Sequence, residues 1–130
     1  MLFRSVYLSA RAAEIIEHLK AEAGDRSVVF ESPMKPRAPL SNMAMLTVLR
    51  RMGLDQQTTV HGLCRATFST WANDAHVYSS DVIEVCLAHR ESDIVKAAYR
   101  RAPEEGAKFE QQRAALMVAW AEFCGSGEPH

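Results

Sequence analysis

Apolar residues recur along the chain every three or four positions, and this spacing predicts a succession of amphipathic helices. The predicted helices cover about residues 10–23, 41–52, 61–75, 79–87, 93–101 and 103–123. Gly24 and Gly53 stand where the first two helices should end, Ser79 is a suitable N-cap, and Pro103 suits a first helical turn. The pattern therefore indicates a chain of separate, capped helices.

Two segments break the helical pattern. Residues 3–8 (FRSVYL) are rich in β-branched and aromatic side chains, and they predict an edge strand whose neighbours lie outside the chain. Residues 31–39 (ESPMKPRAP) carry prolines at a density that excludes a helix or an inner strand, so they predict a loop. We therefore expect a mainly α fold with a small β element. Within the helix over 61–75, the predicted buried stripe is Cys64, Phe68, Trp71 and Ala75.

Composition narrows the class of protein. With 130 residues, 48% hydrophobic and 24% charged, the chain has the composition of one soluble globular domain. It shows no apolar run of membrane-spanning length and no leader pattern, and its three cysteines have unrelated spacings. A reducing, cytoplasmic compartment is the expectation, without a membrane partner. The net charge of -1 excludes a protein that coats nucleic acid by bulk charge, so an anion site requires local clusters of cations.

Three polar features stand out from the apolar helices. His61 and Arg65 are four residues apart, so they share a helix face close to free helix N–H groups, which suits an oxyanion or a phosphate. His89 ends an apolar helix, and Tyr99 lies among cations that would favour a phenolate. Each feature alone has a commoner structural explanation, as a capping histidine, a cation at a helix C-terminus and a core tyrosine.

The order in which these residues occur along the chain matches a pattern known from one protein family. The segments that contain them are VHGLCRATFSTWA at 60–72, DVIEVCLAHRES at 81–92 and VKAAYRRA at 95–102. Together they resemble the catalytic domain of tyrosine recombinases, most closely that of prophage integrases. The loop SPMKPRAPLSN at 32–42 is similar to the segment that precedes those motifs, and the resemblance extends from Val6 to about Phe123. It implies that residues 1–130 are the C-terminal portion of that fold, with 1–103 carrying the motifs and 104–130 forming a C-terminal helix and tail.

The resemblance implies site-specific DNA recombination and integration through a phosphotyrosine link. Tyr99 would be the nucleophile, and Arg65, His61 and His89 would bind the scissile phosphate. The cations that would contact DNA are Arg90, Lys96, Arg100 and Arg101. The implied partner is DNA, with no metal, no other cofactor and no small-molecule substrate.

Two departures from the family pattern affect this assignment. The family spaces its pair as His-x-x-Arg, whereas this chain has one residue more and places Cys64 where the arginine usually stands. A residue four positions after His61 still lies on the same helix face, so we assign the role of the family's arginine to Arg65. The extra residue is then absorbed at the helix start. The family's first catalytic arginine and its strand-borne lysine would lie before Met1. The chain is therefore expected to be part of a longer integrase, as a cloned fragment, a split frame or a decayed gene, and to be inactive alone.

The sequence leaves other functions, and another packing of the last helix, open. A non-enzymatic helical remnant could self-associate or bind DNA weakly through its cations. A metal site using His61, Cys64 or His89 is disfavoured because the spacing lacks a closed set of four ligands. The last helix carries an apolar stripe that a neighbouring copy could cover, giving a homo-oligomer, or that could fold back in cis. That stripe consists of Phe109, Leu116, Met117, Trp120 and Phe123.

Overall fold

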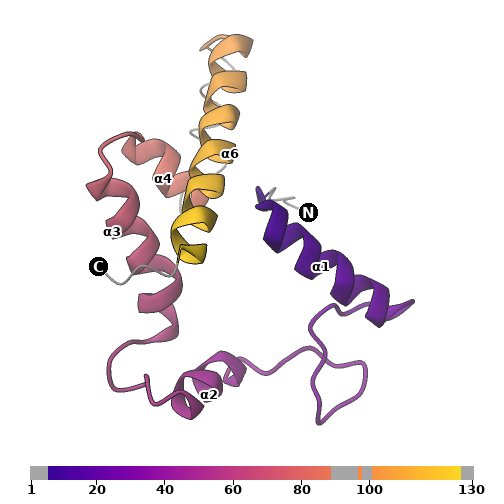
Figure 1. Ribbon diagram of the computed structural model, residues 1–130. Helices are drawn as coiled ribbons and strands as arrows, with labels where there is room; N and C mark the ends of the chain where they lie inside the picture. Colours follow the sequence, from indigo (N-terminus) through magenta and orange to yellow (C-terminus); the bar gives the residue numbers. More distant parts are fainter. Residues whose placement is uncertain (1–5, 89–96, 98–100, 127–130) are drawn as a thin grey trace. The chain divides into compact units, whose positions relative to one another are not determined.

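The computed structural model describes residues 6–88, 97 and 101–126 (Figure 1). Its named elements are α1 (Ala10–Ala23), α2 (Ala44–Arg51), the π-helical turn η1 (Gly62–Ala66), α3 (Thr67–Asp74), α4 (Ser80–Cys86) and α6 (Pro103–Gly125). The fold is mainly helical with almost no strand, which confirms the predicted class. The chain forms two compact units, one of Ala10–Cys64 and one of Met1–Ser9 with Arg65–His130.

The ends of the helices follow the local signals in the sequence. Gly24 and Gly53 follow the first two helices with φ of 61° and 71°, a left-handed conformation that glycine adopts without steric cost. The Ser79 side chain accepts a hydrogen bond from the Val82 amide and so caps α4. Pro103 occupies the first turn of α6. The predicted helix ends at Gly24 and Gly53, the predicted cap at Ser79 and the predicted position of Pro103 are therefore confirmed.

The β structure is smaller than expected. In the described residues it amounts to an isolated antiparallel bridge between Glu31 and Pro39, which closes the proline-rich loop. Residues 6–8 of the predicted edge strand form no strand, and residues 3–5 lie outside the described part of the chain. A strand needs a neighbour for its backbone N–H and C=O groups, and the described residues supply none beside this segment. Tyr7 instead donates a hydrogen bond from its hydroxyl to Glu110 on α6 at 2.7 Å.

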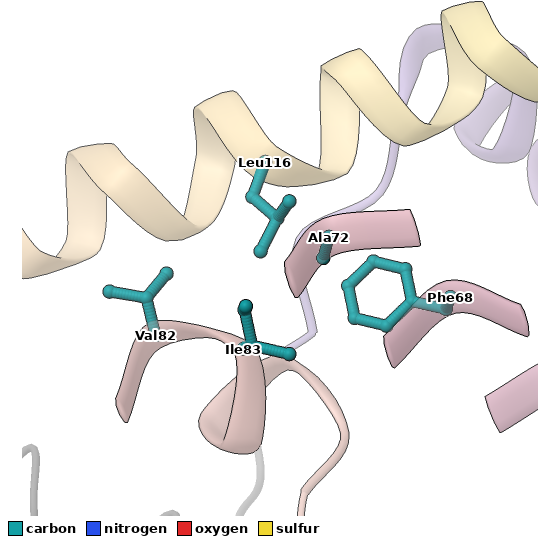
Figure 2. Packing of buried hydrophobic residues seen from close by; sticks show 5 residues of the cluster. All are labelled: Phe68, Ala72, Val82, Ile83 and Leu116. Atoms are coloured by element: carbon teal, nitrogen blue, oxygen red, sulfur yellow. The ribbon is translucent and has the colours of Figure 1, made fainter. Parts of the chain in front are cut away.

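The core lies where α3, α4 and α6 meet. Figure 2 shows Phe68 and Ala72 of α3, Val82 and Ile83 of α4, and Leu116 of α6 turned toward one another. Each of these side chains is buried, with Leu116 and Ala72 fully inaccessible to solvent. Apolar burial of this kind, rather than helix propensity, stabilises such short helices.

The buried face of the third predicted helix differs from the expected stripe. Phe68 is buried and Trp71 packs against the core, but Cys64 and Ala75 are exposed, and Ala72 is buried in their place. A π-helical turn holds one residue more than an α-helical turn, so Cys64 in η1 is out of phase with α3. Ala75 lies beyond the last residue of α3.

The apolar stripe of α6 is covered within its own unit. Phe109, Met117 and Trp120 pack against the core. The Trp120 ring meets Phe68 edge-on at 5.4 Å between centroids and stacks on Phe123 at 5.5 Å. Aromatic pairs at such distances add to the free energy gained by burial alone. Packing in cis therefore accounts for these side chains.

Candidate active site

Arg65 links two segments that are far apart in the sequence. It is half-buried in η1, and its Nη2 donates a hydrogen bond to the carbonyl oxygen of Leu87 at 3.1 Å. Leu87 is the C-cap of α4, where unpaired carbonyl groups carry partial negative charge. A guanidinium is therefore a favourable partner there. The contact brings the first predicted motif against the end of the helix that leads to the second.

The end of α4 is a tight turn. The amides of Leu87 and Ala88 donate to the carbonyl groups of Ile83 and Val85 at 3.1 and 3.0 Å. Ala88 has a φ of 59°, the left-handed conformation that costs a residue with a Cβ about 1–2 kcal/mol. Helices commonly end in this way, though usually with glycine at the left-handed position. The helix thus ends at Cys86, and the turn over Leu87 and Ala88 precedes the predicted His89 in the sequence.

The extra residue of the first motif falls in a π-helical turn. The helix begins at Val60, and η1 follows directly after His61, so the π turn lies near the helix start. The Gly62 amide donates to Thr59 Oγ1 at 2.9 Å, which satisfies one free donor of the first turn. A Cβ at position 62 would lie 3.0 Å from Thr58 Oγ1, so glycine suits this close approach. Isolated π turns inside α-helices are frequent at functional sites.

The other predicted site residues are placed as follows. The side chain of His61 is exposed, and it belongs to the unit of Ala10–Cys64. Arg101 is also exposed, and its Nε lies 3.5 Å from a carboxylate oxygen of Glu105. The remaining predicted residues lie outside the described part of the chain: His89, Arg90, Lys96, Tyr99 and Arg100.

Sequence reasoning missed a buried cluster around Arg113 of α6. Only 4% of Arg113 is exposed, and its Nη1 lies 3.2 Å from both carboxylate oxygens of Glu110. Its guanidinium carbon lies 5.2 Å from the centroid of the Tyr7 ring, a cation–π distance. The sequence signal was available. Glu110 and Arg113 form an i, i+3 pair of opposite charges beside the apolar stripe of α6.

Cys86, the last residue of α4, lies next to this cluster. Burial raises the pKa of the Cys86 thiol above its ordinary value of 9.0, while the nearby Arg113 guanidinium opposes the shift. Since desolvation outweighs the cation, the thiol stays protonated at neutral pH. Its part in the cluster is that of a small, half-buried side chain.

Comparison with known proteins identifies the family. The chain is 35% identical to prophage integrase IntA of Escherichia coli K12 over 119 residues, which are 92% of this chain. It is 34% identical to prophage integrase IntZ of the same strain over 95% of its length, and 30% identical to the integrase of Enterobacteria phage P4 over 91%. The chain belongs to the phage integrases of the tyrosine recombinase type. This integrase chain spans 27%, 30% and 26% of the lengths of these relatives. No family model and no solved structure matches it.

Metal binding and membrane insertion are two further functions on which the described residues of the integrase chain bear. Among its described residues, no group of three or more His, Cys, Asp and Glu side chains could hold a metal ion. No helix within the described ranges is long and apolar enough to cross a bilayer. An open groove of about 560 Å³ lies beside Trp71 and Phe123, lined also by Thr67, Thr70 and Asp74. An acidic side chain in its lining makes this groove a poor site for a phosphate.

Proposed function

We propose that this chain supplies catalytic residues for site-specific DNA integration, through cleavage and religation of DNA strands by a phosphotyrosine link. Tyr99 is the nucleophile. Arg65, His61 and His89 bind the non-bridging oxygens of the scissile phosphate and assist proton movement. Arg90, Lys96, Arg100 and Arg101 contact the flanking DNA backbone.

The observation that supports this proposal is the hydrogen bond from Arg65 to the Leu87 carbonyl. It draws together segments 22 residues apart, which are the two that carry the histidines and the arginine of the motifs. A guanidinium has five N–H donors, and the bond to Leu87 requires one of them. Arg65 therefore retains donors for a phosphate while its position is held by α4.

The chemistry follows from these residue types. The Tyr99 oxygen attacks the phosphorus, a new P–O bond forms to the tyrosine, and the bond to the 5′ oxygen breaks with its electron pair. Arg65 stabilises the charge on the equatorial oxygens without a metal. The energy of the phosphodiester is kept in the phosphotyrosine, so a free 5′ hydroxyl can reverse the step.

The isolated chain is expected to cleave ordinary DNA very slowly. The family's lysine, which would protonate the departing 5′ oxygen, and its first arginine have no counterpart in residues 1–130. Each such group is worth about 10²–10⁴ in rate. A sulfur atom in place of the bridging 5′ oxygen removes the need for the proton, because a thiolate is a much weaker base than an alkoxide.

The test uses nicked duplexes with a randomised sequence around the scissile phosphate, made once with bridging oxygen and once with bridging sulfur. We expect a covalent adduct on a denaturing gel with the sulfur substrate, formed at least ~10²-fold faster than with oxygen. Tyr99→Phe should abolish the adduct. Tyr78→Phe is the matched control, because it removes a hydroxyl outside the three motifs.

Two results would contradict the proposal. An adduct that persists in Tyr99→Phe would show that another residue is the nucleophile. The lack of any adduct on the sulfur substrate, under conditions where the chain binds DNA, would favour the alternative of a helical remnant without catalytic chemistry.

A further inference from the structure

The buried cluster of Arg113 connects three parts of one unit. Tyr7 comes from the segment before α1, Glu110 and Arg113 from α6, and Cys86 from the end of α4. A buried cation is costly unless it is paired, and here the Glu110 carboxylate supplies the countercharge. Tyr7 supports Glu110 with a hydroxyl hydrogen bond and presents its ring face to Arg113. Tyr7 thus positions Glu110, and both residues position Arg113.

The cluster adjoins the turn that ends α4. A cavity of about 20 Å³ is lined by Tyr7, Cys86, Ala88 and Arg113, together with Val6, Val85 and Met117. Ala88 is the residue with the left-handed conformation, so the cluster and the strained position line the same cavity. Strained backbone persists where the surrounding structure fixes it. The Arg113 cluster is the part of that surrounding structure contributed by α6.

Arg65 contacts the same turn through a backbone carbonyl group. Its hydrogen bond goes to the carbonyl of Leu87, the residue between Cys86 and Ala88. The position of that carbonyl depends on how α4 ends. Two arginines, from η1 and from α6, therefore contact one helix end through adjacent residues.

We propose that Arg113 is a positioning residue for Arg65 in the integrase site. Glu110 and Tyr7 hold Arg113 against the end of α4, and that end presents the carbonyl that Arg65 binds. Arg113 is buried, so it contacts neither DNA nor the reacting atoms. The inference rests on the proposed role of Arg65 as a phosphate ligand.

The test measures both the environment of Arg65 and its effect on DNA affinity, in the full chain. The first readout is the NMR signal of the Arg65 Nε–H group, identified by its loss in Arg65→Gln. The second is a double-mutant cycle, with Tyr7→Phe made in the wild type and in Arg65→Gln and binding of a labelled duplex followed by anisotropy at low salt. Tyr7→Phe removes only a hydroxyl, so we expect this variant to fold even where a substitution of the buried Arg113 prevents folding.

We expect Tyr7→Phe and Glu110→Gln each to shift the Arg65 signal. Tyr7→Phe should weaken DNA binding by ~3-fold in the wild type and have no further effect in Arg65→Gln, because both changes act through the same guanidinium. Arg113→Lys should behave like Tyr7→Phe, since an ammonium keeps the charge but lacks the planar fork. Gln111→Ala is the control, because it changes an exposed, uncharged side chain on the same helix and should leave both readouts unchanged.

The outcomes separate this inference from the proposed function. An Arg65 signal that stays in place in Tyr7→Phe and Glu110→Gln would overturn the positioning role, as would additive effects in the cycle. A shifted signal together with DNA binding that is independent of Arg65 would support the positioning role and contradict the proposed role of Arg65 at the phosphate.

Discussion

At the scale of single residues, the end of α4 concentrates the unusual features of this chain. Ala88 adopts a left-handed conformation, Leu87 accepts a hydrogen bond from Arg65, and Cys86 lies beside the buried Arg113. None of these features follows from hydrophobic periodicity. They arise because η1, α6 and the segment before α1 approach the same helix end.

The conformation of Ala88 predicts the effect of a glycine at this position. Ala88→Gly removes the steric cost of a Cβ at φ 59°, although glycine also gains entropy in the unfolded chain. We expect a net stabilisation of about 0.5–1 kcal/mol, measured by urea unfolding. Ala72→Gly, in the buried face of α3, is the control and should destabilise. A loss of stability in Ala88→Gly would show that the alanine side chain is needed in the turn.

The thiol of Cys86 predicts a pH dependence. Because burial raises the pKa of Cys86 above 9.0, the folded state holds the proton more tightly than the unfolded chain. This contribution to stability is complete below the unfolded pKa and is lost as pH rises through the folded value. In a background with Cys64 and Cys124 replaced by alanine, we expect the stability of the chain relative to Cys86→Ala to fall above about pH 9. A difference in stability between this chain and Cys86→Ala that does not change with pH would contradict the raised pKa of Cys86.

At the scale of elements, η1 is the place where the third predicted helix departs from one continuous helical phase. We propose that the π turn takes up the extra position of the first motif before α3, so that the buried residues Phe68 and Ala72 keep the phase that the core requires. Within the turn, Cys64 is left exposed. The predicted stripe was wrong at Cys64 because it assumed one continuous helical phase.

A deletion tests this account of η1. Removing Cys64 should convert the π turn into an ordinary α-helical turn and leave the midpoint of thermal unfolding within a few degrees of the wild type. Removing Thr70 instead, between Phe68 and Ala72, rotates one core residue relative to the other by about 100° and should abolish cooperative unfolding. If both deletions destabilise equally, η1 is not the place where the extra residue is absorbed.

At the scale of the whole molecule, charge limits what the chain can bind. A net charge of -1 and one cluster of cations predict weak, sequence-indifferent DNA binding, with Kd of roughly 10⁻⁴ to 10⁻⁶ M at physiological salt. Affinity should fall steeply as salt is added, which anisotropy titrations at several salt concentrations would measure. Nanomolar binding to one sequence by the isolated chain would contradict this prediction.

The packing of α6 predicts how the chain responds to truncation. Leu116 is fully buried against α3 and α4, so removing residues 104–130 exposes the core made with Phe68, Val82 and Ile83. We expect the truncated chain to lose cooperative unfolding, and the full chain to sediment as a monomer. A full chain that sediments as a dimer, and becomes a folded monomer on truncation, would show that α6 packs on a second copy.

The sequence alone determined most of the described helices, several of their ends and the family motifs, because helical periodicity, caps and glycine stops are local properties of the chain. The bounds of α1 and the caps at Gly24, Gly53 and Ser79 were predictable in this way. Only the tertiary structure decided that residues 6–8 form no strand, that Arg65 binds the end of α4, and that Arg113 is buried. These outcomes depend on which distant elements supply hydrogen-bond partners and countercharges, and no spacing within one segment encodes that.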